Sequence, residues 1–180
     1  MGLSIFNLKM NTNNIINLAR ISLENYFKGK QIISSDKIDQ ELINNKAGVF
    51  VSLHKNGKLR GCIGTFEPTQ DSIASEIIRN AIESAHDPRF LPLSKKELKN
   101  IKIKVDILTK PQKTKKEDLD AKEYGILIQT KDGRRGLLLP DLEGIKTPEK
   151  QIAICRGKAG IRPDEKIEIY RFKVKRYEEE

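Results

Sequence analysis

The sequence contains few of the residues from which disulfide-rich and metal-binding proteins are built. Its 180 residues include no tryptophan, two cysteines and two histidines. Two cysteines do not form a disulfide framework, and these four residues are too scattered to hold zinc or an iron–sulfur cluster. We therefore expect a reduced, cytoplasmic protein with no metal and no other cofactor.

Long hydrophobic runs are also absent. The longest uncharged apolar stretches span a few residues, as at 47–53, whereas a transmembrane helix needs about 20. The first ten residues have neither a sustained apolar stretch nor a small-residue cleavage site, so we expect no secretory signal. Nucleotide-binding, zinc-protease and serine-hydrolase motifs are missing. We interpret residues 1–12 as a flexible leader and residues 13–180 as a single domain, for which a division into two subdomains stays open.

The excess positive charge is concentrated in one stretch. The formal net charge is +9, and residues 95–116 contain nine lysines against Glu97 and Asp106. Such a stretch can attract nucleic acid or an acidic partner. It has no arginine for base recognition and no aromatic residue for base stacking. Its centre alternates between apolar and polar residues, which favours a half-buried strand with a basic outer face. Nucleic-acid binding through 95–116 is therefore a lesser alternative.

Hydrophobic spacing and turn residues predict about four helices and six strands. The helices are expected over 15–28, 36–45, 71–87 and 148–159, and the strands over 48–54, 58–66, 101–109, 124–130, 136–139 and 167–174. Ser35 or Asp36 is expected to cap the second helix, and residues 112–122 to form a polar loop or a short helix. A change of apolar parity between Ile169 and Tyr170 predicts a bulge in the last strand.

This order of elements also predicts the fold class. The pattern contains two hairpins and no regular alternation of strand and helix. A short helix is expected to begin at the capping-box sequence Ser94–Glu97. The elements together favour an α+β fold with a mixed, largely antiparallel sheet flanked by helices.

Asn56-Gly57 is a strong signal for a two-residue hairpin turn. The register that follows pairs Lys55 with Lys58, Leu53 with Arg60, and Val51 with Cys62. His54 then lies on the face of the hairpin opposite to Cys62. The expected register therefore makes His54 a poor general base for the Cys62 thiol.

The return strand carries the sequence Leu-Arg-Gly-Cys-Ile-Gly-Thr at 59–65. Glycines inside a strand mark a bulge or a close approach by backbone or ligand, so Gly61 and Gly64 are candidate binding positions. On an extended strand Arg60 and Cys62 share a face, about 7 Å apart. A cation at that distance favours the thiolate form. Cys62 is thus a candidate nucleophile or redox thiol, and a small buried hydrophobic residue is the plainer interpretation.

Three other groups of residues carry chemistry. His86 is the histidine left as a candidate general base, at the end of a predicted helix, and Asp87 and Arg89 form a plausible ion pair in the turn that follows. Cys155 lies on the apolar stripe of its helix and is expected in the core. Lys158 is expected to complement the dipole of that helix.

Four of these segments together resemble the AMMECR domain family. They are 59–65, 87–90, 136–140 and 158–160, and their order and spacing are similar to those of its prokaryotic branch, called AmmeMemoRadiSam system protein A. The resemblance covers residues 14–178 and implies an α+β fold with a large mixed sheet and a smaller second lobe. It also implies an association with Memo-like and radical-SAM proteins. His86 and Cys155 are not typical motif positions, so the resemblance leaves Cys62 as the thiol to consider.

The resemblance implies no established activity, and two functions of different classes stay open. The favoured one is a binding or accessory protein that acts with Memo-like and radical-SAM partners. Its expected surface for a partner or a small anionic ligand comprises Arg60, Gly61, Gly64, Thr65, Asp87, Arg89 and Lys158. The alternative is an enzyme with Cys62 as nucleophile or redox thiol, in a cleft lined by Arg60, Asp87 and Arg89.

Overall fold

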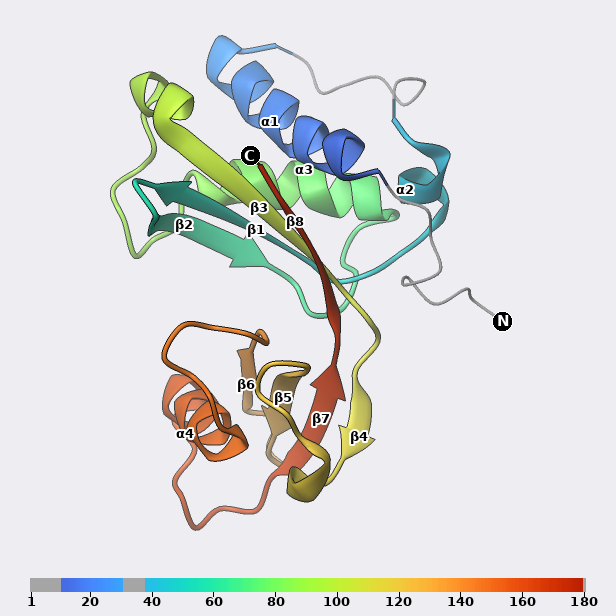
Figure 1. Cartoon of the computed structure of the whole chain (residues 1–180), viewed down its shortest axis with the longest axis vertical. Helices are drawn as coiled ribbons and strands as arrows, with labels where there is room; N and C mark the ends of the chain where they lie inside the picture. The colour runs from blue at the N-terminus through green and yellow to red at the C-terminus, as the bar shows by residue number, and fades with distance from the viewer. Residues whose placement is uncertain (1–10, 31–37, 180) are drawn as a thin grey trace. The chain divides into compact units, whose positions relative to one another are not determined.

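The computed structural model describes residues 11–30 and 38–179. The helices are α1 (Thr12–Lys28), α2 (Gln40–Asn44), α3 (Ile73–Ser84) and α4 (Pro148–Ala159), with 3-10 turns at Lys95–Asn100 and Lys116–Asp118. The strands are β1 (Val49–Lys55), β2 (Lys58–Gly64), β3 (Ile101–Leu108), β4 (Gln112–Thr114), β5 (Gly125–Gln129), β6 (Arg135–Leu138), β7 (Glu168–Phe172) and β8 (Val174–Glu178). Figure 1 shows these elements along the chain, and they confirm the predicted α+β class.

The chain divides into two compact units. The first unit consists of the chain up to Leu108 together with the segment that begins at Lys175. The second unit is Thr109–Val174. Residues 1–10 of the expected leader lie outside the described residues, as do Ser35 and Asp36, the caps expected for the second helix. Within the described residues Asp39 caps α2.

The first unit is a four-stranded sheet with helices on one face. Its strands lie in the order β2-β1-β3-β8, and α1 and α3 pack against it. Val49, Val51 and Leu53 alternate along β1 and are fully buried in the core between the sheet and these helices. The alternation predicted for β3 is confirmed, because Ile101, Ile103, Val105 and Ile107 enter the same core.

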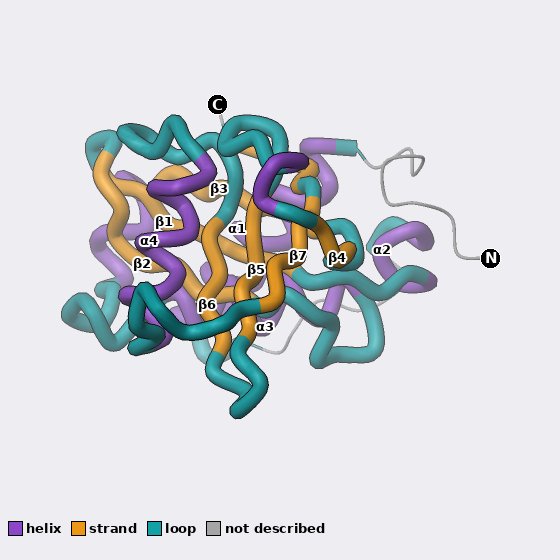
Figure 2. The backbone as a smooth tube through the Cα atoms, turned by 90° about the horizontal axis from the view of Figure 1, so that it is seen from below, coloured by secondary structure: helices purple, strands orange, loops and turns teal. Residues whose placement is uncertain are grey.

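The second unit has its own four-stranded sheet and one long helix. Its strands lie in the order β4-β7-β5-β6, which Figure 2 shows side by side. The helix α4 packs against β5 and β6. The core of the unit contains Cys155 of α4, as predicted, together with Ile126 and Ile128 of β5. Burial raises the pKa of the Cys155 thiol to about 12, so this thiol stays protonated at neutral pH.

Capping residues explain where several helices begin and end. Thr147 caps α4 and is followed by Pro148 at the first helical position, and Gly160 ends the helix with a positive φ, as the sequence predicts. The predicted capping box of Ser94 and Glu97 is present. The α3 helix is capped by Ser72, one residue after the position expected from Asp71.

Two predictions about strands are wrong. The loop expected over 112–122 contains the short strand β4, which pairs with β7. The last strand, expected over 167–174 with a bulge, corresponds to β7, and the chain then continues into β8 of the other sheet, which was not predicted. The pairing of β7 with β5 is regular at Ile169 and Tyr170, and the break lies at Lys173. The expected bulge is therefore absent from this pairing, and the parity change lies within β7.

Candidate functional site

The hairpin of β1 and β2 has the predicted turn but a different register. Asn56 and Gly57 both have positive φ, as the predicted turn requires. Beyond the turn, the register shifts between Leu53 and His54, so that Leu53 pairs with Gly61. Arg60 is the extra residue of this β-bulge. The expected pairing of Leu53 with Arg60 is therefore wrong, because a two-residue turn does not prevent a bulge further along the strands.

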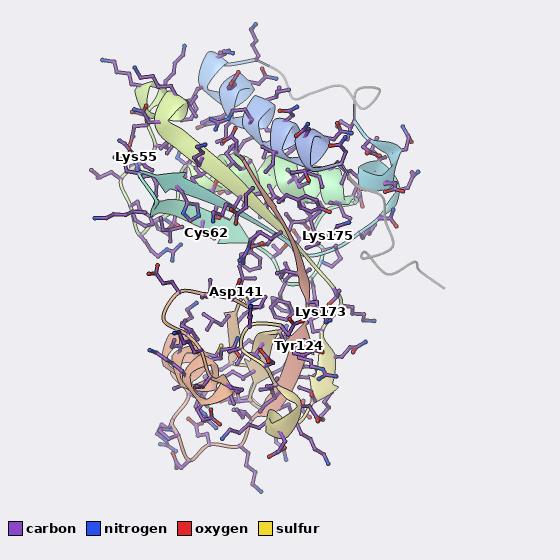
Figure 3. The ribbon with its side chains drawn as sticks, in the orientation of Figure 1. Lys55, Cys62, Tyr124, Asp141, Lys173 and Lys175 are labelled. Atoms are coloured by element: carbon purple, nitrogen blue, oxygen red, sulfur yellow. The ribbon has the colours of Figure 1, made fainter. Side chains whose placement is uncertain are left out.

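The bulge changes which residues surround Cys62. Cys62 pairs with Ser52 rather than with Val51, so its side chain lies on the face of the sheet opposite to the helices. His54 lies two residues from Ser52 on the same face, and its Nε2 is 3.1 Å from the Ser52 Oγ. The expectation that His54 lies on the other face is wrong. Figure 3 marks Cys62 on β2, and this half-buried thiol shares a face with a histidine that sequence reasoning dismissed.

The imidazole of His54 is held in its neutral form near pH 7. Burial lowers the pKa of His54, and the positive charge of Lys104 on the neighbouring strand lowers it further. Arg176 also lowers this pKa, whereas Glu178 and Asp106 raise it. A neutral imidazole can accept a proton, which is the property that a general base requires.

Asp87 and Arg89 bind the backbone of Cys62. Because β2 is an edge strand, the amide and carbonyl of Cys62 that point away from β1 need partners from outside the sheet. The Asp87 Oδ2 accepts a hydrogen bond of 2.8 Å from the Cys62 amide. The Arg89 guanidinium donates one of 3.2 Å to the Cys62 carbonyl. The two side chains thus take the place of a neighbouring strand at this residue.

Asp87 and Arg89 form a close ion pair in which the aspartate is buried and the arginine is exposed to solvent. The Asp87 side chain is 1% exposed, whereas that of Arg89 is 59% exposed, and their nearest charged atoms are 2.6 Å apart. The hydrogen bonds from Arg89 hold the pKa of Asp87 at about 2, and the hydrogen bonds to Asp87 raise the pKa of Arg89. The sequence predicted that this pair fixes the turn, and the structure adds that it also fixes Cys62.

This depressed pKa predicts a loss of stability in acid. The carboxylate of Asp87 is bound in the folded state with a pKa of about 2, whereas its ordinary pKa, expected in the unfolded chain, is 3.8. Its contribution is therefore complete above about pH 5 and is lost as the pH falls toward 2. Between pH 6 and pH 3 the wild type should lose about 1 kcal/mol more unfolding free energy than Asp87→Asn, measured by urea denaturation. Equal losses in the two proteins would contradict this assignment.

Arg60 has a different partner from the one expected. Its guanidinium binds both carboxylate oxygens of Glu97, at 3.1 and 3.2 Å, and lies 3.5 Å from the carbonyl of Pro92. Lys55 binds the same carboxylate. The hydrogen bond from Arg60 is the main reason that the pKa of Glu97 is lowered to about 2. Arg60 therefore ties β2 to the segment that precedes β3, and the cation that contacts the Cys62 backbone is Arg89.

Gly61 and Gly64 of β2, and Thr65 directly after it, serve close packing and loop structure. A Cβ on Gly61 would overlap the backbone carbonyl of Ser84, and one on Gly64 would overlap the ring of Phe50. The hydroxyl of Thr65 donates to the fully buried carboxylate of Glu76 on α3. Gly61 and Gly64 were expected to allow a close approach, and the approaching groups are parts of the protein itself.

The other predicted site residues lie elsewhere. His86 has its Nε2 2.9 Å from the hydroxyl of Tyr26 on α1, so its ring contacts α1 from the turn that follows α3. Lys158 belongs to the second unit, where its ammonium donates to the carbonyl of Leu137 at 3.3 Å. Over residues 11–30 and 38–179, no three His, Cys, Asp or Glu side chains are grouped as a metal site requires. No helix in the same part of the chain is long and apolar enough to cross a membrane.

The lysine-rich stretch does not form one strand face. It is divided between the two units at Leu108, so β3 and β4 belong to different sheets. Three of its nine lysines bind carboxylates: Lys104 pairs with Glu178, Lys113 with Glu168 and Lys116 with Glu149. These pairs reduce the positive charge that the stretch offers to a nucleic acid.

A feature that sequence reasoning missed is the exposed loop at 88–92. Its first end is held by the Asp87–Arg89 pair, and its second end by Arg60 at Pro92 and by the buried side chain of Leu93. Between these ends, Leu91 is 84% exposed. A proline stands at each end of the loop. Prolines limit backbone freedom, so this pair was the sequence signal that could have indicated a restrained loop. Arg60, Asp87 and Arg89 therefore position an apolar side chain in solvent.

Comparisons with known proteins agree with this architecture. The AMMECR1 family profile matches residues 16–177. A protein of Thermotoga maritima is 49% identical over 160 residues, which are 86% of this chain and 91% of that protein. A Clostridium acetobutylicum protein is 46% identical over 91% of this chain, but the match spans only 36% of that longer protein. The crystal structure of an uncharacterised Pyrococcus horikoshii protein matches with a TM-score of 0.84 and 32% identity, over 92% of this chain and 90% of that one. The chain therefore belongs to the AMMECR1 family.

Proposed function

We propose that the protein is a binding or accessory component that acts with Memo-like and radical-SAM partner proteins. The observation that carries this proposal is the loop 88–92, where the motif residues hold Leu91 in solvent. Burial of a large apolar side chain is favourable, and a loop whose two ends are already held loses little conformational entropy on binding. The exposed guanidinium of Arg89 beside it supplies a charge that can select among partners.

The roles of the other motif side chains support a binding function. Asp87 is buried against the Cys62 backbone, Arg60 binds Glu97, and Thr65 binds Glu76. These groups maintain the shape of β2 and of the loop that follows α3. In the loop 88–92 this assembly presents the large side chains of Arg89 and Leu91 to solvent. We infer that the motif maintains a contact surface in which the charged and apolar groups lie two residues apart.

Replacement of Leu91 with aspartate tests this proposal directly. We expect the affinity for the cognate partner to fall about thirtyfold, the effect of losing one buried hot spot of about 2 kcal/mol. The measurement is calorimetric titration with purified Memo-like and radical-SAM proteins encoded in the same genome. Ile21→Asp on α1 is the matched control, because Ile21 is an exposed apolar residue elsewhere in the first unit and is 43% exposed. Equal affinities of wild type and Leu91→Asp would refute the proposal.

A second candidate function is cysteine-dependent chemistry at Cys62. It is favoured by the bulge, which places the half-buried thiol opposite Ser52 and on the same face as the neutral His54. Ser52 lies between them on that face and can relay a proton from thiol to imidazole. In this candidate function Arg89 orients the backbone of the nucleophile, Cys62, in addition to any contact with the substrate.

Thiol alkylation separates this candidate from a structural role of Cys62. With iodoacetamide we expect one carbamidomethyl group per native chain, at Cys62, because Cys155 is buried and has a pKa of about 12. If His54 removes the thiol proton, His54→Gln should slow this reaction at pH 7 without changing the melting temperature. Mass spectrometry of quenched samples gives both rates. No reaction at Cys62 before unfolding would exclude the cysteine-dependent function and leave the binding proposal intact.

A further inference from the structure

The second unit contains a cavity of about 650 Å³ beside α4. One wall is formed by α4, and another by the segment that leads from the end of α4 into β7. The apolar lining residues are aliphatic and comprise Ile152, Ala153, Ile161, Pro163, Ile167 and Ile169. Its volume lies within the range of about 300–1,000 Å³ typical of small-molecule sites. The absence of aromatic rings from this lining suits a flexible aliphatic chain.

Gly157 lines this cavity from within α4. It is an interior residue of the helix, without the positive φ that requires glycine. A Cβ built on it would meet no atom within 4 Å outside the helix itself. Glycine at such a position weakens the helix relative to alanine, and neither backbone conformation nor internal packing requires it. The open space above Gly157 leaves room for a ligand to contact the helix backbone.

Arg156 places a positive charge at the same cavity. Its guanidinium donates to the carbonyl of Glu165 at 3.0 Å and to the carbonyl of Arg162. These two bonds orient the guanidinium and use two of its five N–H groups. Both acceptors are neutral, and among the described residues no carboxylate forms an ion pair with Arg156. The charge is therefore oriented but not neutralised, which is the requirement for binding an anionic group.

The other two charged lining residues neutralise each other. The ammonium of Lys116 is 3.0 Å from a carboxylate oxygen of Glu149 at the start of α4. Lys116 lowers the pKa of Glu149, which keeps this pair ionised at neutral pH. The net charge of the cavity lining is thus that of Arg156, and it is positive.

We propose that this cavity binds a small aliphatic carboxylate. The aliphatic chain occupies the isoleucine-lined space against Gly157, and the carboxylate is bound by the guanidinium of Arg156. The proposal is independent of the partner-binding loop, because every lining residue belongs to the second unit. It adds a small-molecule site to a protein whose proposed function is contact with other proteins.

Calorimetric titration of the full-length protein with decanoate, below its micellar concentration, tests this site. We expect saturable binding at one site, about tenfold tighter than that of decan-1-ol, because only the carboxylate forms a charge-assisted hydrogen bond with Arg156. Arg156→Gln should abolish this preference. Gly157→Leu should weaken the binding of both compounds by at least about tenfold, because its side chain fills the space that the aliphatic chain needs.

Two controls keep these outcomes interpretable. Lys150→Gln removes a positive charge from an exposed position of α4 that does not line the cavity, and it should bind decanoate like the wild type. Gly157→Leu should melt at or above the wild-type temperature, because it replaces a helix-interior glycine beside open space. The proposal is overturned if folded wild type does not bind decanoate, or if Gly157→Leu binds it equally. Equal affinities for decanoate and decan-1-ol would also overturn it and would indicate a purely apolar occupant, such as a side chain of a partner protein.

Discussion

Replacing Asp87 with alanine is expected to lower the free energy of unfolding by about 3 kcal/mol. The substitution removes a buried carboxylate that accepts hydrogen bonds from the Cys62 amide and from Arg89. It leaves that amide without its acceptor at the edge of the sheet and Arg89 without its counter-charge. Because the chain has no tryptophan, the measurement is urea unfolding at pH 7 followed by circular dichroism.

The matched control for this prediction is Asp71→Ala. Asp71 is also an aspartate of the first unit, but its side chain is fully exposed and its ion pair with Lys46 has an N–O distance of 3.4 Å. Exposed pairs of this kind contribute little to stability, so the control should change the unfolding free energy by less than about 0.5 kcal/mol. If Asp87→Ala is as stable as Asp71→Ala, the role assigned to Asp87 in holding Cys62 is wrong.

Gly61→Ala should be destabilising by a similar amount, about 3 kcal/mol. The added methyl group would overlap the backbone carbonyl of Ser84 at the end of α3, and α3 cannot move away without disturbing the core to which its Ile77 and Ala81 belong. The same substitution at Gly157 meets open space and should stabilise the protein by up to about 1 kcal/mol. Urea unfolding of the two variants measures the difference, and a shift of the same sign in both would contradict the packing at Gly61.

Local patterns predicted much of the fold. The alternation of apolar and polar residues predicted β3, and the Asn56-Gly57 turn predicted the hairpin. The Thr147-Pro148 cap predicted the start of α4. Each of these features depends on interactions between residues near in sequence. The separation of β7 from β8 was not predictable in this way, because it depends on which sheet each strand joins.

The geometry around Cys62 was predicted only in part. Asp87 and Arg89 were identified as a pair, whereas the bulge at Arg60 was not, and the bulge decides the face on which Cys62 lies. Bulges depend on how both strands pack in three dimensions, and Gly61, the residue after this bulge, packs against Ser84 at the end of α3. The ion pair of Arg60 with Glu97 was also not predicted. Glu97 is 37 residues away in sequence, and its local pattern indicated only a helix-capping residue.

We propose above that the motif residues hold the loop 88–92 for contact with a protein partner. Amide hydrogen exchange of the protein, alone and with each purified Memo-like or radical-SAM protein, tests it most directly. We expect slower exchange in the loop 88–92 on binding of one partner, and loss of this protection in Leu91→Asp at the same concentrations. Binding that protects other segments while exchange in the loop stays unchanged would contradict the claim.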